Sequence, residues 1–476
     1  MRFLILRLGC RKSKEVIMPA YKTAHADVRE LAETVSGHVL LPGDNDYDAI
    51  RQVHNGMIDK HPAVIVRCAG VSDVVDALQF AVANDLEIAV RGGGHNVAGH
   101  AVCDDGIMLD MSLMKGIHVD PASRTVRVQP GVNWGEFNRE TLLHGLATTG
   151  GAVSSTGVTG LTLGGGFGYL MGKYGFTIDS LIAAELVTIN GDILQANGVE
   201  NAELFWGLRG GGGNFGVVTS LEFQLHRLDR EVEGGLIAYP FDQADDVLKF
   251  YRTQTQDQPD ELSMVASLTH APDGSGTPLI AMLACHSGSK AEATQAIGKI
   301  KAFGTPAIDH LGAIDYGQLN TILDKGFPKS AHSYWKSSFI ADLTDEVQGI
   351  LKERLLASPS AMSKLIIERF HGAATRREPD ATAFPHRQSG YNILIIAQWP
   401  DAAGSEASIV WAKQTFAALK PHMDKGVYAN YMSDDEPVSR VEQAFGENYK
   451  RLQILKQQYD PDNRFHLNQN ISPAHD

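Results

Sequence analysis

Cysteines, long apolar runs and basic clusters are all scarce in this chain, and each absence excludes a class of protein. The cysteines form no Cys-x-x-Cys pair, so reduced thiols are expected rather than a disulfide framework; they are Cys10, Cys68, Cys103 and Cys285. No stretch of about 20 apolar residues occurs, which argues against a membrane-spanning helix. The apolar start is short and interrupted by Arg7, so we expect a cytoplasmic protein that begins at Met1 or Met18.

Positive charge is also in deficit. The chain has 42 Lys and Arg against 56 Asp and Glu, a net charge of −14. A nucleic-acid partner is therefore not expected, because phosphate binding requires clustered Lys and Arg. A hydrophobic fraction of 43% with 21% charged residues describes a globular protein. Its 476 residues exceed one ordinary core, so two or more domains are expected.

Glycine, in contrast, is concentrated in three places. Ten of the 26 positions from Gly150 to Gly175 are glycine, far above the roughly 7% that is usual. Smaller clusters occupy 92–94 and 207–216. Glycine loses the most entropy on ordering, so such runs persist where the backbone must approach another group closely. We expect that group to be a dinucleotide.

The first half of the chain reads as alternating helices and strands. A strand at 63–67, a helix that Ser72 would cap, and a strand at 86–90 form a βαβ unit that ends at the first glycines. Asn190-Gly191 indicates a hairpin turn. The other elements expected here are helices at 26–35 and 134–144 and strands at 107–111, 125–129, 181–189 and 217–225.

After about Leu228 the composition changes and glycine becomes less frequent. Apolar runs at 279–285 and 391–398 are typical of strands in an antiparallel sheet, and helices are expected between them at 290–303 and 406–419. A charged amphipathic helix at 447–456 follows near the end. The pattern predicts an α+β fold with a second domain of different architecture.

The loop Arg91-Gly-Gly-Gly-His95-Asn96 offers a row of backbone N–H groups with no Cβ in the way, which suits a pyrophosphate. A plain turn is the alternative, and the pattern is not the Gly-x-Gly-x-x-Gly that opens a Rossmann helix. His95 could equally be a buried, hydrogen-bonded histidine. A metal site with His100, Cys103 and Asp104 lacks the regular ligand spacing of zinc sites.

Four blocks together resemble the FAD-linked oxidases of the vanillyl-alcohol oxidase/p-cresol methylhydroxylase type, in the berberine-bridge-enzyme-like branch. They are Arg91 to Asn96, Gly157 to Gly168, Leu204 to Gly216, and Asn448 onward through Tyr459-Asp-Pro-Asp-Asn to Asn468-Gln-Asn470. The resemblance covers roughly residues 30–476. It implies a two-part FAD-binding domain around a substrate domain whose antiparallel sheet is flanked by helices. The division that follows is a tail at 1–24, FAD-binding parts at 25–228 and 427–476, and a substrate domain at 229–426.

The resemblance also implies that His95 carries the flavin on its 8α carbon. Neutral imidazole is a competent nucleophile near neutral pH. Many relatives add a second bond from a cysteine, but Val153 stands at that position here, so a single attachment is expected. The remaining residues expected to bind FAD are Arg91, Gly92, Gly93, Gly94, Asn96, Ser154, Ser155, Gly157, Gly160, Leu161, Thr162, Gly164, Gly165, Gly168, Val218, Tyr459, Asn468 and Asn470.

The segment Val427 to Tyr431 resembles a strand in which the family places its catalytic base, and the resemblance assigns that role to Tyr431, with Tyr428 beside it. In a strand the two rings would point to opposite faces, so a bulge or twist would be needed. Glu368 matches a position for an acidic active-site group, although a solvated strand residue is the alternative. Three aromatic residues could line a pocket or simply pack: Trp335, Tyr391 and Trp399.

The resemblance implies an FAD-dependent oxidase that moves hydride from an alcohol carbon of a sugar or natural product to FAD and reduces dioxygen to hydrogen peroxide. Gly151 matches a position that controls oxygen entry in relatives, where glycine leaves room. Three alternatives remain: a dehydrogenase of the same fold with another acceptor, an NAD-binding Rossmann dehydrogenase, and a non-catalytic flavin-binding protein. The sequence identifies neither the substrate nor the oligomeric state.

Overall fold

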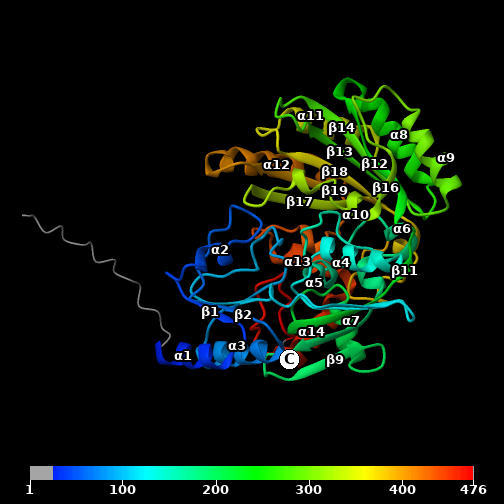
Figure 1. Ribbon diagram of the computed structural model, residues 1–476. Coiled ribbons are helices and arrows are strands. Elements are labelled where there is room, and N and C mark those ends of the chain that lie inside the picture. Colours follow the sequence, from blue (N-terminus) through cyan, green and yellow to red (C-terminus); the bar gives the residue numbers. More distant parts are fainter. Residues whose placement is uncertain (1–24, 475–476) are drawn as a thin grey trace, which may run out of the picture.

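The computed structural model describes residues 25–474 and contains three larger sheets and one short ribbon. In Figure 1 the N-terminal and C-terminal segments form the lower part, and one large sheet with its helices forms the upper part. Cys10 and both candidate starts, Met1 and Met18, lie outside the described residues. Within residues 25–474, no helix is long and apolar enough to cross a membrane.

The first sheet contains the expected βαβ unit. Its strand order is β1 (His38–Leu40), β2 (Val64–Arg67), β4 (Ile107–Asp110) and β3 (Ile88–Arg91), with β4 parallel to both neighbours. Helices α1 (His25–Thr34) and α3 (Val71–Ala83) pack against it. The predicted cap at Ser72 is wrong, because α3 already begins at Val71 and Gly70 occupies the cap position. The predicted helix and strands are otherwise confirmed.

The second sheet is antiparallel, in the order β5 (Ile117–Asp120), β6 (Thr125–Val128), β10 (Val217–Gln224), β8 (Leu181–Val187) and β9 (Ile193–Asn197). The expected hairpin joins β8 to β9. Helix α14 (Tyr449–Tyr459) shares a core with α7 (Ala202–Leu208), through Leu452 and Leu455 against Leu204 and Trp206. The C-terminal helix therefore completes a core that the N-terminal half begins (Figure 1).

The third sheet has eight strands, and its order is β15 (Ile308–Asp309), β12 (Glu231–Pro240), β14 (Pro278–His286), β13 (Leu262–His270), β18 (Lys364–Phe370), β19 (Gly390–Trp399) and β17 (His332–Ile340), with β16 (Gly312–Asp315) on β12. Neighbouring strands run antiparallel. Figure 1 shows α8 (Ala244–Gln256), α9 (Lys290–Lys301) and α11 (Asp345–Leu356) on its upper side, with α12 (Ser405–Leu419) beside β19. The α+β fold with a helix-flanked antiparallel sheet is thus confirmed.

Alternation along the strands of this sheet decides which side chains face the rest of the molecule. Leu365 and Ile367 of β18 point into the core shared with the helices. Lys364, Ile366 and Glu368 therefore point the other way, toward the glycine-rich segments. The remaining elements are short: α2 (Tyr47–Arg51), α4 (Trp134–Thr141), β7 (Leu146–Ala147), α5 (Val158–Leu163), α6 (Met171–Tyr174), β11 (His226–Arg227), α10 (Tyr316–Leu319) and α13 (Val438–Phe445).

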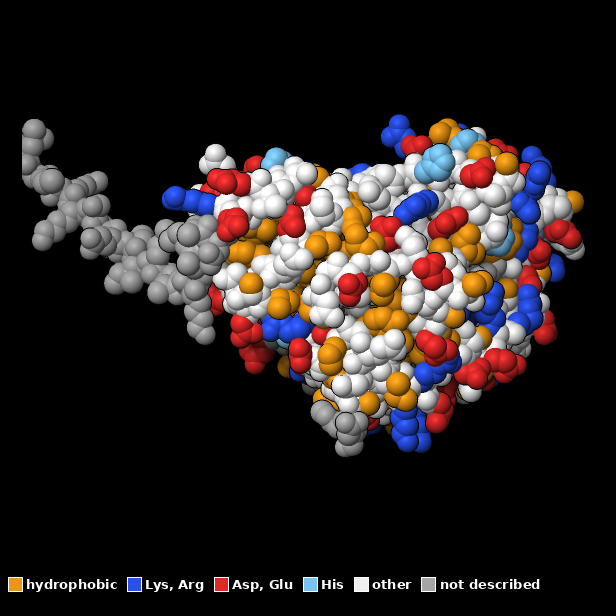
Figure 2. All heavy atoms as spheres, turned by 90° about the horizontal axis from the view of Figure 1, so that it is seen from below, with side chains coloured by type: hydrophobic (Ala, Val, Ile, Leu, Met, Phe, Trp, Pro, Cys, Tyr) orange, Lys and Arg blue, Asp and Glu red, His pale blue; other side chains and the backbone are white. Residues whose placement is uncertain are grey.

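The face in Figure 2, seen from below the view of Figure 1, has charged side chains mainly around its rim. Blue basic side chains lie there among red acidic ones, and the centre is largely apolar and uncharged. On this face acidic and basic side chains are therefore mixed, without a cluster of one sign at its centre.

Candidate active site

The loop that follows β3 lines a cavity of about 460 Å³. Six of the residues expected to bind FAD line it, and they are Arg91, Gly92, Gly93, Gly94, His95 and Ser155. Segments from elsewhere in the chain complete the wall, including His54, Lys115, Asn133, Asp324, Phe327 and Lys329. The hydrogen-bonding groups of Asn133 and Glu136 already pair with each other's backbone amides as a cap on α4, so the Asn133 side chain is not free to bind a ligand.

Arg91 anchors this loop rather than offering a free charge to a ligand. Its guanidinium lies 2.9 Å from a carboxylate oxygen of the fully buried Asp110 and also donates to the carbonyls of Ile50 and Gln52. Asp110 also accepts a hydrogen bond from Arg67. The Arg91 guanidinium is thus held by a buried carboxylate and two backbone carbonyls, so it fixes the backbone of the loop.

His95 lies at the centre of the cavity wall. Its Nε2 is 2.9 Å from the hydroxyl oxygen of Ser155, and its ring stacks on that of His54 with centroids 3.9 Å apart. Burial, together with the nearby charge of His54, lowers the pKa of His95 from 6.5 to about 3. The imidazole is therefore neutral at physiological pH, which is the form with a nucleophilic nitrogen.

The glycines of the two loops allow a direct contact between backbones. A Cβ on Gly93 would lie 2.4 Å from the backbone nitrogen of Gly157, and a Cβ on Gly157 would lie 2.5 Å from that of Gly93. The loop that bears His95 and the segment that bears Ser155 can therefore meet only because both positions lack a side chain.

Other predicted glycines lie against protein atoms instead of the cavity. A Cβ on Gly164 would be 2.2 Å from the side chain of Asn430, and one on Gly168 would be 1.8 Å from the carbonyl oxygen of Gly150. Gly165 has a positive φ of 124° and faces Phe384. Gly164 thus allows Asn430 of the C-terminal segment to pack closely, whereas Gly168 allows the glycine-rich stretch to pack on itself.

The remaining predicted residues are distributed around the site. Thr162 donates to the carbonyl of Val158 within α5, Gly160 of the same helix is exposed, and Leu161 is partly buried. Asn96 accepts from the backbone of His100, and Ser154 binds the carboxylate of Asp324 through its amide and hydroxyl. Val218 and Tyr459 belong to the second sheet's core.

The C-terminal segment presents polar groups that lack partners. Asn468 Oδ1, Gln469 Nε2 and Asn470 Oδ1 are buried without a hydrogen-bond partner among the described residues. Asn214, from the third glycine cluster, fixes this segment by donating to the carbonyl of Gln469 and accepting from the amide of Ile471. Unpaired buried amides are costly, so a partner outside the chain is expected for them.

A second group of residues lies on the face of the large sheet that is opposite its helices. Tyr431 donates a hydrogen bond to Glu368 Oε1 at 3.1 Å, and Asn392 donates to Glu368 Oε2 at 2.7 Å. Burial raises the pKa of Glu368 to about 7, although both hydrogen bonds act to lower it. Glu368 is therefore not a solvated strand residue.

The strand expected at Val427 to Tyr431 is wrong. The backbone forms a 3₁₀ turn, η8 (Ala429–Tyr431), closed by a hydrogen bond from the Tyr431 amide to the Tyr428 carbonyl. Residues three apart eclipse in a 3₁₀ turn, so both rings point to one side without a bulge. Their centroids are 4.7 Å apart.

Tyr428 and Tyr431 differ in their surroundings. The Tyr428 hydroxyl oxygen accepts from the amide of Gly166 and from Asn430 Nδ2, and its ring stacks on Phe167 at 3.8 Å. Tyr431 has Glu368 as its hydroxyl partner, and burial beside that carboxyl raises the pKa of Tyr431 well above 10. In the resting protein Tyr431 is thus protonated and donates a hydrogen bond to Glu368.

The three aromatic residues that could either line a pocket or pack in the core lie on different faces of the large sheet. Tyr391 and Trp399 belong to the core between the large sheet and its helices, so they pack. Trp335 is half-buried on the other face, 5.6 Å from the Tyr431 ring and 6.2 Å from Phe327. It therefore links the tyrosine group to the wall of the cavity.

The open space expected beside Gly151 for oxygen entry is occupied by the side chains of Trp134 and Leu161. A Cβ there would lie 2.9 Å from Trp134 Cδ1 and 3.0 Å from Leu161 Cδ1. Cys68, Cys103 and Cys285 are free, fully buried thiols, and Cys68 and Cys103 pack as expected. Burial raises the pKa of Cys103 to about 12, which makes it unreactive.

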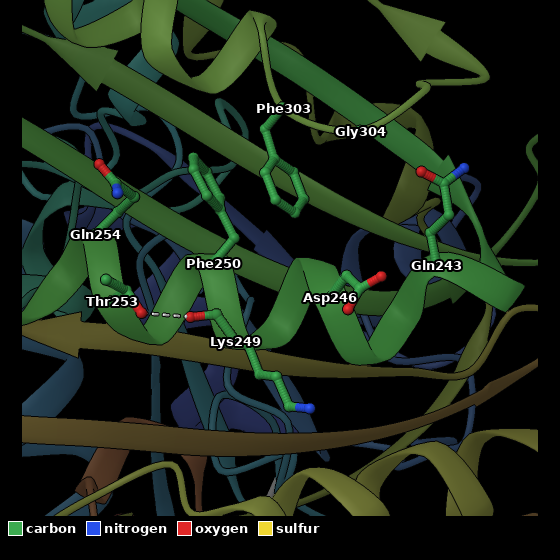
Figure 3. A pocket seen from close by; sticks show the side chains of 8 residues that line it. All are labelled: Gln243, Asp246, Lys249, Phe250, Thr253, Gln254, Phe303 and Gly304. Atoms are coloured by element: carbon green, nitrogen blue, oxygen red, sulfur yellow. Dashed lines mark hydrogen bonds between the residues drawn. The ribbon is translucent and has the colours of Figure 1, made fainter.

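A second hollow, of about 410 Å³, lies on the far side of the large sheet along α8 (Figure 3). Phe250 and Phe303 stack at 4.1 Å and form its wall, and Lys249, Thr253 and Gln243 extend around its rim. None of the predicted site residues lines it.

Comparison with known proteins agrees with this arrangement. Residues 62–197 match the family model described as FAD binding domain, and residues 427–472 match the one described as berberine and berberine like. An FAD-linked oxidoreductase of Dictyostelium discoideum is 32% identical over 453 residues, covering 94% of this chain and 97% of the relative. The (R)-6-hydroxynicotine oxidase of Paenarthrobacter nicotinovorans is 31% identical over 463 residues, covering 92% and 97%.

Solved structures give the same fold. The 6-hydroxy-D-nicotine oxidase of Arthrobacter nicotinovorans superposes with a TM-score of 0.84 at 30% identity, covering 93% of this chain and 99% of that one. A berberine-bridge-enzyme-like protein of Physcomitrella patens has the same TM-score at 21% identity, covering 94% and 100%. The chain is therefore an FAD-linked oxidoreductase. Within that class it belongs to the berberine-bridge-enzyme-like family, which confirms the resemblance and excludes an NAD-binding Rossmann enzyme.

The residues present fit FAD. The cavity is lined by Gly92 and the exposed Gly93 and has a neutral imidazole at its wall, and the C-terminal segment has unpaired side-chain oxygens at Asn468 and Asn470. Backbone amides without side chains suit a pyrophosphate, and side-chain amides suit the edge of a flavin ring or a ribityl chain.

Proposed function

We propose that this chain is an FAD-dependent oxidase whose flavin is bound covalently and only once, through His95. The neutral ring of His95 at the cavity wall supports the attachment. Val153 supplies no thiol at the position where relatives form a second bond. FAD, when bound, accepts hydride from a substrate carbon and passes the electrons to dioxygen, which yields hydrogen peroxide.

The hydrogen bond from Tyr431 to Glu368 is the observation on which the catalytic proposal rests. An alcohol can release hydride only if its hydroxyl proton is removed, so a base must stand beside it. We assign that base to Tyr431, which passes its own proton to Glu368 as it accepts the proton of the substrate. With a pKa of about 7, Glu368 can change its charge at physiological pH.

Tyr428 acts through position rather than proton transfer. Its hydroxyl is occupied by the amide of Gly166 and by Asn430, and its ring packs edge-on against Tyr431. Asn430 also donates to the carbonyl of Leu161. Tyr428 therefore holds the 3₁₀ turn that presents Tyr431.

The substrate is proposed to be a small alcohol, either a sugar or a natural product, that binds beside the Tyr431–Glu368 pair, next to Trp335. Oxidases among the relatives favour dioxygen as the acceptor. A dehydrogenase of the same fold is the second candidate, because Trp134 and Leu161 fill the space at Gly151 that was expected to admit oxygen.

Reduction of the purified protein by alcohols under anaerobic conditions, followed by admission of air, tests this proposal. An oxidase regains its yellow colour within one turnover and releases hydrogen peroxide, whereas a dehydrogenase stays reduced until a dye is added. We keep the domain limits at 25–228, 229–426 and 427–476, the remaining FAD-binding residues and the cytoplasmic location as predictions.

A further inference from the structure

His54 lies directly against the ring of His95. It follows α2, far from the glycine loop in sequence, and its ring stacks on His95 with centroids 3.9 Å apart and planes 29° apart. Stacking covers one face of each imidazole ring and excludes water from it. No motif in the sequence singles out His54.

Two segments fix the position of the His54 ring. Its backbone amide donates to the carbonyl of Gly94 at 2.9 Å, which joins it to the glycine loop. Its Nε2 lies 3.1 Å from the carbonyl oxygen of Phe327, and its own carbonyl accepts from the amide of Ser330. Because a carbonyl can only accept, Nε2 of His54 carries the proton.

The segment 324–330, which contacts His54, also contacts the residues on the other side of the His95 ring. Asp324, three residues before Phe327, accepts two hydrogen bonds from Ser154, at 2.9 Å from the amide and 2.6 Å from the hydroxyl. Ser155, the next residue, lies 2.9 Å from His95 Nε2. The 324–330 segment therefore determines both the stacking partner and the hydrogen-bonding partner of the His95 ring.

We propose that His54 is the positioning residue for the covalent attachment of flavin to His95, holding the nucleophilic ring in one orientation and dry. This inference rests on the proposed attachment. The bond joins an imidazole nitrogen to the 8α carbon of the flavin. One hydrogen leaves the imidazole and one leaves the methyl group, their two electrons pass to the flavin ring, and dioxygen takes both hydrogens and electrons as hydrogen peroxide.

Burial is the main cause of the lowered pKa of His95, and His54 is the only charged neighbour among the described residues that adds to it. The titratable groups that line the same cavity are His54, Arg91, Lys115, Asp324 and Lys329. Arg91 pairs with Asp110, which Arg67 also contacts, and Glu136 pairs with Lys115. Without the His54 ring, water would reach His95 and its pKa would return toward its ordinary value near 6.5.

The test compares His54→Ala, His54→Phe and the remote control His118→Ala as full-length proteins prepared with little flavin and then given FAD. Covalent incorporation is followed by intact mass after denaturation at pH 6 and pH 8, and noncovalent binding by flavin fluorescence. Wild type and His118→Ala should incorporate FAD equally fast at both pH values. His54→Ala should bind FAD yet be at least about ten-fold slower at pH 6, and less impaired at pH 8.

His54→Phe keeps a stacked ring and should remain within about three-fold of the wild type. Incorporation by His54→Ala at the wild-type rate, or by His54→Phe as slowly as by His54→Ala, would overturn the inference. If His54→Ala loses the fold, His54→Gln replaces it, with the same slow incorporation expected. A wild type that never holds FAD covalently would instead refute the proposed attachment, and this inference with it.

Discussion

At the residue scale, catalysis is assigned to one pair of side chains. Tyr431→Phe removes the hydroxyl that would receive the substrate proton and leaves the ring packed against Trp335. Flavin reduction by an alcohol should slow by at least about 100-fold, as is usual when a general base is lost. Stopped-flow absorbance of the bound flavin measures this rate. Tyr239 donates from its hydroxyl to the Ile300 carbonyl, away from the site, so the control variant Tyr239→Phe should reduce flavin at the wild-type rate. A wild-type rate in Tyr431→Phe would remove Tyr431 from the mechanism.

Glu368 gives the reaction its expected pH dependence. Its pKa is raised to about 7, so it is protonated below that pH and cannot accept the proton of Tyr431. Flavin reduction should therefore rise with pH through about 7 in the wild type. Glu368→Gln should be slower and lose this transition, which a pH series of reduction rates will reveal. A variant that keeps the same transition would assign it to another group.

The same shift affects the stability of the protein. A carboxyl whose pKa is higher in the folded than in the unfolded state binds its proton more tightly when folded, so stability falls as pH rises from about 4.5 to 7. Glu368→Gln cannot ionise. Its melting temperature relative to the wild type should therefore be higher at pH 8 than at pH 4. An equal difference at both pH values would contradict the raised pKa.

The role of a residue could be predicted from the sequence only where the residue lies in a local motif. Three glycines before His95 indicated a ligand-binding loop, and Val153 could be compared with a known motif. His54 and Asp324 carry no such signal, because they approach His95 from segments about 40 and 230 residues away, a contact that only the tertiary fold creates. Tyr431 could be named by resemblance, but its hydrogen bond to Glu368 could not.

At the scale of elements, the glycine loop and the glycine-rich stretch work as one unit. Gly93→Ala would place a Cβ 2.4 Å from the backbone nitrogen of Gly157 and so separate the two segments. The variant should melt at a lower temperature and retain less FAD, measured as the ratio of flavin absorbance to protein absorbance. Gly298→Ala, at an open position on α9, is the matched control and should melt no lower than the wild type. Equal flavin content in both variants would show that this contact is dispensable.

The wrong strand at Val427 to Tyr431 has a physical cause. The resemblance implied an extended chain there, but the Asn430 side chain donates to the Leu161 carbonyl and to the Tyr428 hydroxyl. Such side-chain bonds compete with strand pairing and stabilise a turn. Gly164 permits this, since any Cβ at that position would collide with Asn430. A partner that lies more than 250 residues away cannot be read from a local pattern.

At the scale of the whole molecule, the architecture was largely predictable and the active site was not. Apolar patterns identified the βαβ unit and two strands of the large sheet, β14 and β19, and Asn190-Gly191 identified the β8–β9 turn, because each of these signals is local. The order of those strands, and the face of the sheet that carries Glu368, follow from pairings across the chain. The C-terminal helix joins the N-terminal core through α7, which only the resemblance had indicated.

The covalent flavin on His95 is tested most directly by the intact mass of the denatured, purified protein together with its absorbance spectrum. We predict the mass of the polypeptide plus one FAD, a yellow colour that remains after acid precipitation, and loss of both the added mass and the colour in His95→Ala. A polypeptide of unmodified mass, or one that keeps a covalent flavin in His95→Ala, would contradict this prediction.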